Sequence, residues 1–573
     1  MIPSTKWVMR ETDANLTLMA QTLGISQVTA RVMANRGIRT KNTALQFLQP
    51  ALGDLRPFFE MKDAKKALSR IRHAIHNGEK ITIYGDYDAD GITSTAILQK
   101  VLARLGADVS YYIPHRITEG YGLNKNAVQT LAEGGTKLLI TVDNGISAIE
   151  EVALAKSLGM DTVIIDHHEP GNELPPAVAI VDPKQPDCPY PFKELCAGGL
   201  AYKLAAALCE YMSEPFAEQD ESLVLAAIAT ICDIVPLKGE NRILANCGMV
   251  VLNSNKLVNP GLGSLITVRG YLEKPIDTFT IGFVIGPCIN AAGRLSNAAS
   301  AVELLVAGAE DIATRMQITH ELVQLNDERK QLTADCTEKI LASLPPELDK
   351  VLVIEDMEIH ESIAGIVAGR IREATGRPTI VLTQGDSAMK GSGRSAPCYN
   401  MFEALSANRH LFTKFGGHAM AAGLTLPQEN IPILREALNR DCTLTAEDFC
   451  KIVEIDCELT LADVTIPLAD EITRLAPFGS GNHEPLFVSR NLYAENVRVM
   501  DEKNTLIFTL ADSHGRKVKG IAFGLNEVYA SAVEEAVVNK TGGFGIDVVY
   551  GVEVNVYNGM QSVQMRVRDF VIG

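Results

Sequence analysis

The 573-residue sequence lacks several features that would place it in a common class of protein. Its longest apolar stretch, Leu223–Cys232, is far shorter than the roughly 18 residues that cross a bilayer, so no membrane span is predicted. The first residues, MIPSTKWVMR, have no basic start followed by an apolar core, so we expect a cytoplasmic protein without a secretory signal. None of the 11 cysteines forms a CxxC pair, which favours reduced, mostly buried thiols.

Positive charge is also scarce. The chain has 53 Lys and Arg against 70 Asp and Glu, a net charge of −17, which argues against a general polyanion binder because such binding neutralises phosphates with cations. A nucleic-acid enzyme is compatible with this charge, since divalent metal ions can supply positive charge locally. The hydrophobic fraction of 46% and the charged fraction of 21% are ordinary for a folded protein, and the length predicts two to four domains.

Short apolar runs alternate with helical patterns from Lys80 onward. The helical patterns include TSTAILQKVLARLG, NKNAVQTLAEGG and SAIEEVALAKSLG, and the runs are ITIYGD, VSYYIP, KLLITVD, TVIID and AVAIVD. Strand and helix in alternation predict an α/β fold with a largely parallel sheet that is covered on both faces.

The remaining patterns predict the domain organisation. Residues 303–344 form one long helical pattern, although two helices broken near Gly308 would give the same pattern. Apolar and polar residues alternate on both sides of Asn558-Gly559 and predict a hairpin, and LIFTLADSHGRKVKGIAF predicts another. Such hairpins are typical of a small β-barrel or a sandwich. The predicted segments are an N-terminal helical segment (1–75), a parallel α/β domain (76–300), a connecting helix (301–345), a smaller α/β domain (346–448) and a β domain (449–573).

Carboxylates and imidazoles follow three of the predicted strands. The first strand is followed by Asp86, Asp88 and Asp90, the next by Asp143, and the third by Asp166-His167-His168. Because ligands bind at the carboxyl ends of strands in an open parallel sheet, we expect these side chains to share one crevice.

The carboxylates in such a crevice would repel one another without a positive counter-charge. Carboxylates and imidazoles without cysteine favour Mn²⁺ or Mg²⁺ over Zn²⁺, and the number of ligands favours two metal ions bridged by one carboxylate, for which Asp143 is the candidate. A lone Asp after a strand is more often a helix cap, and a DxDxDG run also occurs in calcium loops. Here the twelfth position from Asp86 is Ile97 rather than Glu, which argues against an EF-hand.

These residues resemble the DHH phosphoesterase superfamily, which is named for an Asp-His-His such as Asp166–His168. DYDADG and VDNG resemble its first two motifs. Further segments, from about Arg36 to the C-terminus, resemble its RecJ family of bacterial single-strand-specific DNA exonucleases: PHRITEGYG, CDIVPL, INAAGRL, GSGRS, FGGHAMAAG and PFGSGN. The resemblance implies a DHH domain, a long helix, a DHH-associated domain and an oligonucleotide-binding barrel.

The resemblance also implies roles for single residues. The implied metal ligands are Asp88, Asp90, Asp143, His167 and Asp233, with Asp86 as a further ligand or a group behind them. His168 would face the scissile phosphate. The implied substrate-binding residues are Arg116, Arg294, His360, Ser392, Arg394, Gly417 and His418, of which Ser392 and Arg394 are predicted in a Gly-rich turn that forms a phosphate nest.

Three segments depart from the family pattern. Cys288 stands where the family has Arg, which puts one phosphate contact in doubt. Ile359 precedes His360 where the family has Trp, and His483 interrupts the GNPEP segment. None of these departures touches an implied metal ligand.

The implied activity is a 5′→3′ exonuclease that uses two divalent metal ions, Mn²⁺ or Mg²⁺, and releases 5′-mononucleotides from single-stranded DNA in recombination and repair. Its implied partners are single-stranded DNA, a single-strand-binding protein and a helicase, and the chain itself would be a monomer. Two alternatives are a small-nucleotide phosphoesterase, against which the barrel-like C-terminus argues, and an inactive DNA-binding scaffold, against which the retained acidic cluster argues.

Overall fold

The computed structural model describes residues 5–385, 388–500, 505–524, 533–538 and 543–573. The chain forms two compact units, each of which is assembled from separate parts of the sequence. The first unit contains mainly residues 56–233 and 248–452, and the second contains residues 7–55, 234–247 and 453–573. Within the described residues, no helix is long and apolar enough to cross a membrane.

The first unit begins with a five-stranded sheet in the order β3-β2-β4-β5-β6, and every neighbouring pair is parallel. The structure therefore confirms the predicted parallel α/β fold. The strands are β2 (Ile81–Tyr84), β3 (Val109–Tyr112), β4 (Leu138–Val142), β5 (Asp161–Ile165) and β6 (Ala179–Val181).

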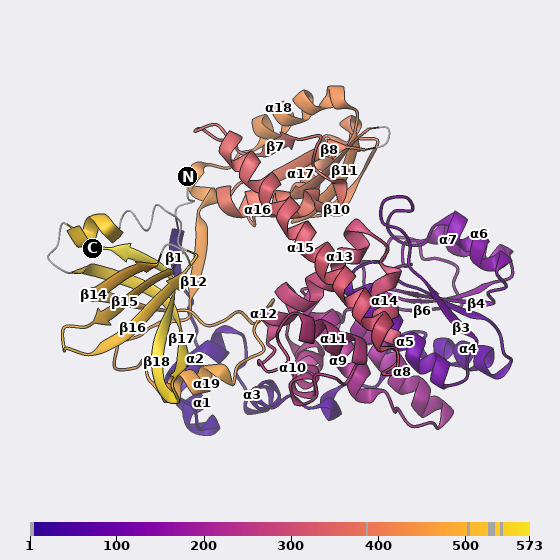
Figure 1. The fold of residues 1–573 in the computed structure, drawn as a ribbon, viewed down its shortest axis with the longest axis horizontal. Coiled ribbons are helices and arrows are strands. Elements are labelled where there is room, and N and C mark those ends of the chain that lie inside the picture. Colours follow the sequence, from indigo (N-terminus) through magenta and orange to yellow (C-terminus); the bar gives the residue numbers. More distant parts are fainter. Residues whose placement is uncertain (1–4, 386–387, 501–504, 525–532, 539–542) are drawn as a thin grey trace. The chain divides into compact units, whose positions relative to one another are not determined.

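Helices cover both faces of this sheet (Figure 1). On one face, Tyr84, Leu139 and Ile164 pack against α6 and α7 in a single apolar cluster. Every residue of β2 and β4 is buried, as expected for strands covered on both sides. The helices of this part are α4 (Ala64–His76), α5 (Ala89–Arg104), α6 (Lys125–Glu133), α7 (Ile149–Ser157), α8 (Ala197–Met212) and α9 (Gln219–Cys232), with the 3₁₀ turn η2 (Phe58–Glu60) ahead of them.

A helical region follows the sheet and ends in a helix of 32 residues, α15 (Ile312–Ser343). The predicted connecting helix over 301–345 is wrong in its first part, because the chain breaks between α14 and α15. The alternative of two helices broken near Gly308 is the one that the structure adopts. The other elements of this region are α11 (Pro260–Val268), α12 (Thr278–Thr280), the π-helix η3 (Ile281–Ile285), α13 (Gly286–Leu295) and α14 (Ala299–Val306). The helix α10 (Gly239–Ser254) is divided between the two units, with its residues up to 247 in the second.

The helix α15 leads to a smaller α/β part with a sheet in the order β10-β11-β9-β8-β7 (Figure 1). The GSGR part of GSGRS belongs to strand β9 and FGGH belongs to strand β10, so the predicted Gly-rich turn at Ser392 and Arg394 is wrong. Gly391 can occupy a strand because the side chains of Leu382 and Leu424 fill the space of its missing Cβ. The elements are β7 (Leu352–Glu355), α16 (Glu361–Thr375), β8 (Thr379–Gln384), β9 (Met389–Arg394), α17 (Met401–Ala407), η4 (Arg409–Leu411), β10 (Lys414–His418), β11 (Ala421–Leu426), η5 (Gln428–Asn430) and α18 (Ile431–Asp441).

The second unit is built around a β-barrel. Strands β14, β15, β16, β18 and β17 pair in that order, and β14 also pairs with β17, which closes the sheet on itself. Both predicted hairpins are present, and Asn558 and Gly559 have the positive φ angles, 50° and 77°, of a two-residue hairpin turn. The strands are β13 (Cys457–Glu458), β14 (Phe487–Met500), β15 (Thr505–Ala511), β16 (Lys517–Phe523), β17 (Gly543–Tyr557) and β18 (Met560–Ile572).

The N-terminal segment is not entirely helical, because β1 (Thr5–Met9) pairs with β12 (Lys451–Ile455). The pairing joins segments more than 440 residues apart, so a pattern within the first 75 residues could not reveal it. The helical elements of the second unit are α1 (Leu16–Leu23), α2 (Gln27–Asn35), α3 (Lys41–Leu48), η1 (Leu52–Asp54) and α19 (Ile466–Thr473), and η6 (Ala446–Phe449) precedes β12.

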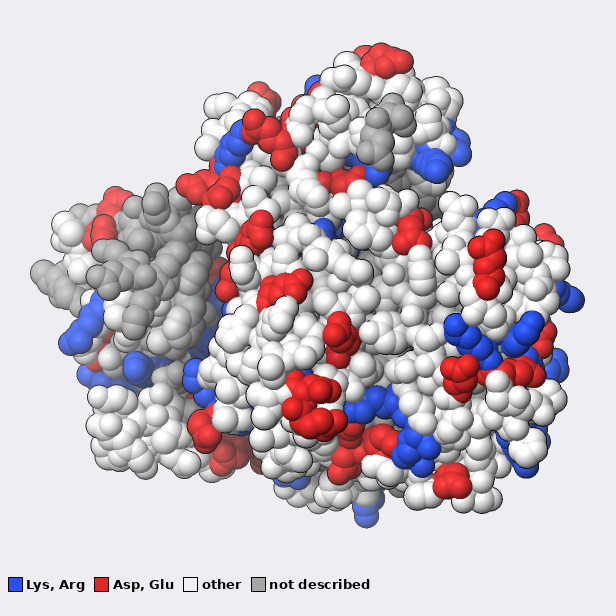
Figure 2. All heavy atoms as spheres, turned by 45° about the vertical axis from the view of Figure 1, so that its right-hand side comes forward, with Lys and Arg blue, Asp and Glu red and all other residues white. Residues whose placement is uncertain are grey.

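Charged side chains are interspersed on the surface. On the described part of the face in Figure 2, acidic side chains are scattered among basic ones rather than gathered over one element. Any contact with a polyanion on this face therefore depends on local groups of cations.

Candidate metal centre and phosphate-binding cavity

The candidate metal centre lies at one edge of the parallel sheet. Strands β2, β4 and β5 are neighbours and run in the same direction, so the residues that follow them meet at their carboxyl ends. Asp86, Asp143 and His167 are buried there, with exposed fractions of 3%, 3% and 7%. The structure thus brings together the side chains that the sequence placed after three strand ends.

Three groups of side chains at this edge have ligand atoms within 4.8 Å of one another. Asp143 belongs to two of these groups, and so does His167. Both residues can therefore be shared between two neighbouring metal ions. The groups are Asp143, His167 and His168; Asp90, His167 and Asp233; and Asp86, Asp88 and Asp143.

His167 lies among three carboxylates. Its Nε2 atom is 3.1 Å from Oδ1 of Asp143. The same atom is 3.6 Å from Oδ2 of Asp90 and 3.7 Å from Oδ2 of Asp233. Asp233 caps the C-terminal end of α9, so a residue distant from the sheet in sequence completes the cluster.

Backbone N–H groups orient two of the carboxylates. The N–H groups of Ala197 and Gly198, at the start of α8, donate to Asp90 at 2.8 and 2.6 Å. Asp88 is the N-cap of α5 and accepts from the N–H groups of Asp90 and Gly91 at 3.0 and 3.2 Å. Asp88 thus has the ordinary capping role that a lone Asp suggests, together with its place in the cluster.

Burial and mutual repulsion disfavour the charged forms of these carboxylates. Burial, followed by the charge of Asp88, raises the pKa of Asp90 to about 7. Burial and the neighbouring Asp90 raise the pKa of Asp233 to about 8, and the pKa values of Asp86 and Asp143 are also well above their ordinary value. Burial lowers the pKa of His167 to about 3, which leaves its imidazole neutral and able to bind a metal.

The donor set fits divalent metal ions. Oδ1 of Asp86 is buried and accepts no hydrogen bond from any described residue, which is costly for a carboxylate unless a cation binds it. Oxygen ligands with a neutral imidazole suit Mn²⁺ and Mg²⁺. Asp143 has a φ of 63°, a left-handed backbone conformation that residues other than Gly, Asn and Asp rarely adopt.

His168 differs from His167 in its partner. Its Nδ1 atom donates to Oδ1 of Asp166 at 2.7 Å. Despite its burial, the hydrogen bond and charge of Asp166 raise the pKa of His168 to about 9, so the imidazole is positively charged at neutral pH. The hydroxyl of Tyr121 lies 3.3 Å from Nε2 of His168.

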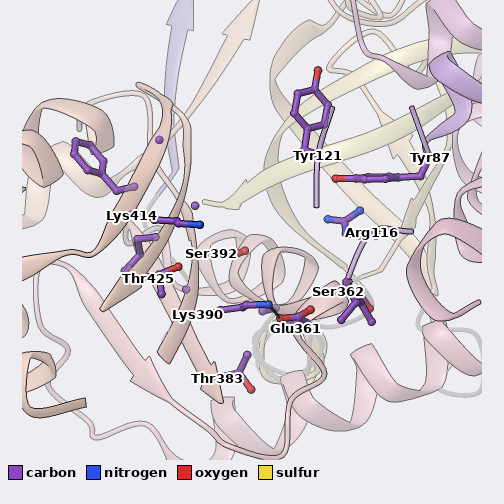
Figure 3. A pocket seen from close by; sticks show the side chains of 17 residues that line it. Tyr87, Arg116, Tyr121, Glu361, Ser362, Thr383, Lys390, Ser392, Lys414 and Thr425 are labelled. Atoms are coloured by element: carbon purple, nitrogen blue, oxygen red, sulfur yellow. Dashed lines mark ion pairs between the residues drawn. The ribbon is translucent and has the colours of Figure 1, made fainter. Parts of the chain in front are cut away.

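A cavity of about 500 Å³ lies within the same unit. Tyr87, Arg116 and Tyr121 line one side of it, and residues of α16, β9, β10 and β11 line the other (Figure 3). Arg116 lies over the ring of Tyr87, 4.9 Å from its centroid. Lys390 of β9 forms an ion pair of 2.6 Å with Glu361 of α16.

The register of the smaller sheet places polar groups and glycines on one face. Lys390, Ser392 and Arg394 alternate along β9, so their side chains point to the same face. Ser392 pairs with Gly423, which pairs with Gly416, and a Cβ at either glycine would meet open space. The cavity therefore has a floor of bare backbone beside a hydroxyl and a cation, which suits a phosphate.

Other implied phosphate-binding residues lie outside the lining of this cavity. Arg394 packs against Gly365 of α16, and Nη1 of Arg294 donates to the Ser362 carbonyl at 2.8 Å. Burial and the charge of Arg116 lower the pKa of Arg294, to about 10, and that of Arg394, which indicates three cations close together.

Three further sequence predictions have a structural explanation of their own. His360 is the N-cap of α16, where its Nδ1 atom lies 2.7 Å from the Ser362 hydroxyl. Gly417 has a φ of 147°, and a Cβ there would lie 2.3 Å from the Ala421 carbonyl oxygen. His418 is exposed at the end of β10.

Cys288, which replaces the family Arg, is fully buried. Its thiol lies 3.2 Å from the Val284 carbonyl, and Nδ2 of Asn326 lies 3.4 Å from the sulfur. Arg329 donates to Oδ1 of the same Asn326 at 2.9 Å. Position 288 thus contributes packing, and a cation from α15 lies on the other side of Asn326.

Sequence reasoning missed several residues of the site. Asp182 directly follows β6, is buried, and has a pKa raised to about 7 mainly by burial. The rule that identifies the other strand ends applies to it equally, because AVAIVD is also predicted to be a strand. Tyr87 and Tyr121 also line the cavity and lie within DYDADG and PHRITEGYG, two segments of the family resemblance. Glu361, Lys390 and Lys414 line it without a local signal in the sequence.

Known protein families match three parts of the chain. Residues 80–230 match the DHH family, N-terminal domain. Residues 348–443 match the DHHA1 domain, and residues 455–569 match the RecJ OB domain.

Curated relatives and solved structures cover nearly the whole chain. The single-stranded-DNA-specific exonuclease RecJ of Bacillus subtilis is 38% identical over 99% of this chain and 71% of its own length. The protein of the same name from Escherichia coli is 31% identical over 97% of both chains. The crystal structure of RecJ in complex with Mn²⁺ from Thermus thermophilus superposes with a TM-score of 0.83 and 30% identity, over 99% of this chain and 79% of that one.

Proposed function

Because the chain belongs to the RecJ family of single-stranded-DNA-specific exonucleases, we propose that its Asp and His cluster is the catalytic centre. The chain is a metal-dependent hydrolase of single-stranded DNA that uses Mn²⁺ or Mg²⁺. The proposed ligands of two metal ions are Asp86, Asp88, Asp90, Asp143, His167 and Asp233. The observation that carries this assignment is the convergence of these groups within 4.8 Å in overlapping sets.

Divalent ions held by this set would activate a water molecule as nucleophile and stabilise negative charge on the phosphoryl oxygens. The chain's own groups complete the site. His168, kept protonated by Asp166, is a positive donor beside the cluster and is proposed to bind a non-bridging oxygen of the scissile phosphate. Neutral His167 serves as a ligand and not as an acid, because burial keeps the proton off its ring.

The cavity beside the cluster is proposed to hold the end of the strand. Arg116 and Ser392 supply a cation and a hydroxyl on a floor of glycine backbone, and Arg394 and Arg294 lie nearby. Lys390 adds a second cation that is already paired with Glu361. This set suits a terminal 5′ phosphate, which favours 5′→3′ polarity with release of 5′-mononucleotides. The residues that line the cavity come from both α/β parts of the first unit. We further propose that the passage between these two parts admits one strand and excludes a duplex.

A time course on single strands labelled at the 5′ or the 3′ end tests the polarity. With Mn²⁺ or Mg²⁺, a 5′ label is expected to appear at once as mononucleotide, while a 3′ label stays on progressively shorter strands. Chelator should stop both reactions. Early release of the 3′ label would overturn the polarity, and equal rates on blunt duplex would overturn the steric passage.

The cellular role is also part of the proposal. A single-stranded-DNA exonuclease is suited to recombination and repair in the cytoplasm, together with a helicase that supplies single strands and a single-strand-binding protein that covers them. We propose that the chain acts as a monomer. Light scattering at micromolar concentration, with and without a single strand, would contradict this if it gave twice the chain's mass of 62.0 kDa.

A further inference from the structure

The first turn of α5 connects two separate parts of the proposed metal centre. Asp88 and Asp90 belong to different groups of candidate ligands, and neither belongs to both. Ala89, the residue between them, therefore joins one ligand of each group. Its backbone position sets the spacing of the two carboxylates. That spacing matters for the reaction, because two metal ions act on one phosphate only when they lie about 3.5–4 Å apart.

The backbone N–H of Ala89 has its acceptor in a distant part of the chain. Oδ1 of Asn290, in α13, accepts a hydrogen bond from it at 2.7 Å. The first N–H groups of a helix have no partner within the helix, and Asp88 caps only the next two, those of Asp90 and Gly91. Asn290 therefore supplies an acceptor that the local sequence does not, from 201 residues away.

One face of α13 contacts the ligand segment and the smaller α/β part together. Asn290, Gly293 and Arg294 are spaced by three and four residues, so they share a face of the helix. A Cβ at Gly293 would lie 2.3 Å from the carbonyl oxygen of Tyr87, so the helix packs directly on the backbone beside Asp88. Arg294 donates to the Ser362 carbonyl at 2.8 Å. These contacts hold Asn290 in a fixed position relative to Ala89.

The start of α13 packs against another ligand segment. A Cβ at Gly286 would lie 2.3 Å from Sγ of Cys232, the residue before Asp233. The helix therefore touches the backbone around Ala89 at one end and the neighbour of Asp233 at the other. A residue that merely capped α5 would need neither of these close approaches. The arrangement instead suits a helix that holds ligand segments in register.

We propose that Asn290 is a positioning residue for the two metal ions. This inference rests on the proposed function of the Asp and His cluster. By accepting the N–H of Ala89, Asn290 fixes the turn from which Asp88 and Asp90 each reach a separate ion. Residues that orient metal ligands in this way typically contribute about ten- to a hundredfold to metal affinity or activity. Asn290 acts through the backbone and contacts neither strand nor metal in this role.

The test measures Mn²⁺ binding by the full-length protein without DNA, with free Mn²⁺ followed by electron paramagnetic resonance. Asn290→Leu and Asn290→Ala remove the acceptor, the first at nearly constant volume and the second with the best helix former. Asn290→Asp keeps an acceptor at the same place. The matched control is Asn400→Leu, which removes the N-cap of α17, where Oδ1 accepts from the Glu403 N–H at 3.2 Å.

The parent protein is expected to bind two Mn²⁺ ions. Asn290→Leu and Asn290→Ala should bind at least one of them about tenfold more weakly, because the turn no longer holds its two ligands in place. Asn290→Asp should bind both ions at least as tightly as the parent protein, since its carboxylate accepts the same hydrogen bond. Asn400→Leu should lower the melting temperature through the lost cap and leave Mn²⁺ affinity unchanged.

Hydrolysis of single strands should follow the same pattern. At limiting Mn²⁺, kcat of Asn290→Ala should fall about tenfold while KM stays at the parent value, because no contact with the strand is removed. Raising the Mn²⁺ concentration should restore most of kcat. A residue that bound the strand would instead raise KM at every metal concentration.

Parent-like Mn²⁺ affinity in a folded Asn290→Leu or Asn290→Ala protein would overturn the inference and leave Asn290 as a helix cap only. Equal loss of affinity in Asn290→Asp would also overturn it, since the accepted hydrogen bond would then have no effect. Failure of the proposed function gives a different result, because the parent protein would then bind Mn²⁺ no more tightly than Asp143→Asn does. Circular dichroism of each variant identifies the folded proteins.

Discussion

Asp166 and His168 are joined by a hydrogen bond of 2.7 Å between Oδ1 and Nδ1. Asp166 also accepts from the backbone N–H groups of His167 and Ile146, at 2.8 and 3.0 Å, so its orientation is fixed from three sides. The adjacent His167 instead directs its Nε2 atom toward Asp143, at 3.1 Å, and burial lowers its pKa. Two neighbouring histidines therefore carry different charges at neutral pH.

Asp166→Asn is expected to lower the pKa of His168 from about 9 toward its ordinary value of about 6.5, because the charged partner is lost. The pair stabilises the fold while both groups are charged. That contribution is lost as pH rises through the raised pKa of His168, or as pH falls through the lowered pKa of Asp166. Imidazole NMR titration of the metal-free protein measures the change.

Glu169→Gln, which changes an exposed carboxylate beside the pair, is the control. An unchanged His168 titration in Asp166→Asn would show that Asp166 does not keep His168 protonated. Melting temperatures of the two variants should differ most near neutral pH and converge above about pH 10.

Asp143→Asn is expected to reduce hydrolysis by more than about a hundredfold, because a shared metal ligand is lost. Asn tolerates the left-handed backbone at this position, so the fold is preserved where Ala would be strained. Removing one of several repelling carboxylates should also raise the melting temperature of the metal-free protein. Near-normal activity with added Mn²⁺ would rule out Asp143 as the bridging ligand.

The metal-free protein is expected to lose stability as pH rises from about 4 to 8. Asp90 and Asp233 have pKa values of about 7 and 8 in the folded chain, so the folded state holds protons that the unfolded state releases near pH 4. Their contribution is fully present below pH 4 and is lost as pH rises through these raised values. Thermal melts in chelator across this range measure the effect.

Added Mn²⁺ should raise the melting temperature more at pH 8 than at pH 5.5. At pH 8 the carboxylates of the cluster have lost their protons, and the bound ion then supplies the positive charge that offsets their repulsion. The double variant Asp90→Asn/Asp233→Asn should show a flatter pH dependence in chelator. A metal-induced gain that is equal at both pH values would contradict the assignment of these two carboxylates as ligands.

Gly423→Val tests the open floor of the cavity that is proposed to bind phosphate. A side chain there meets open space and no neighbouring atom, so the fold should tolerate it, and replacing a strand glycine should add about 0.5–1 kcal/mol of stability. The valine would nevertheless occupy the space proposed for phosphate, so KM for single strands should rise about tenfold. Gly515→Val, in a turn with positive φ, is a contrasting control that should lower stability without changing KM.

The parallel sheet and its proposed metal-binding edge are predictable from the sequence because the signals are local. Runs such as ITIYGD combine an apolar strand with the polar residues that follow it, and parallel topology then brings Asp86, Asp143 and His167 to one edge. Asp182 carries the same signal, although the predicted site does not include it. Asp233 has no such signal, because it ends a helix, and only the family resemblance pointed to it.

The face that is proposed to bind phosphate is harder to predict. Strands β9 and β10 are rich in glycine and short in apolar residues, so GSGRS and FGGH look like turns. Their strand character comes from pairing with β8 and β11, which depends on the whole sheet. The pairing of β1 with β12 was invisible for the same reason. Lys390 and Lys414 become neighbours of Arg116 only through tertiary packing.

Because α15 is one continuous helix, its length and helical phase determine the distance and the rotation between the parts of the first unit that precede and follow it. A helix of 32 residues is about 48 Å long, and each added residue turns everything beyond it by about 100°. One inserted alanine in its middle would rotate β9 away from the sheet edge that bears Asp143. Seven inserted residues would restore the rotation but lengthen the rod by about 10 Å, so angular and linear tolerance of the enzyme can be measured separately.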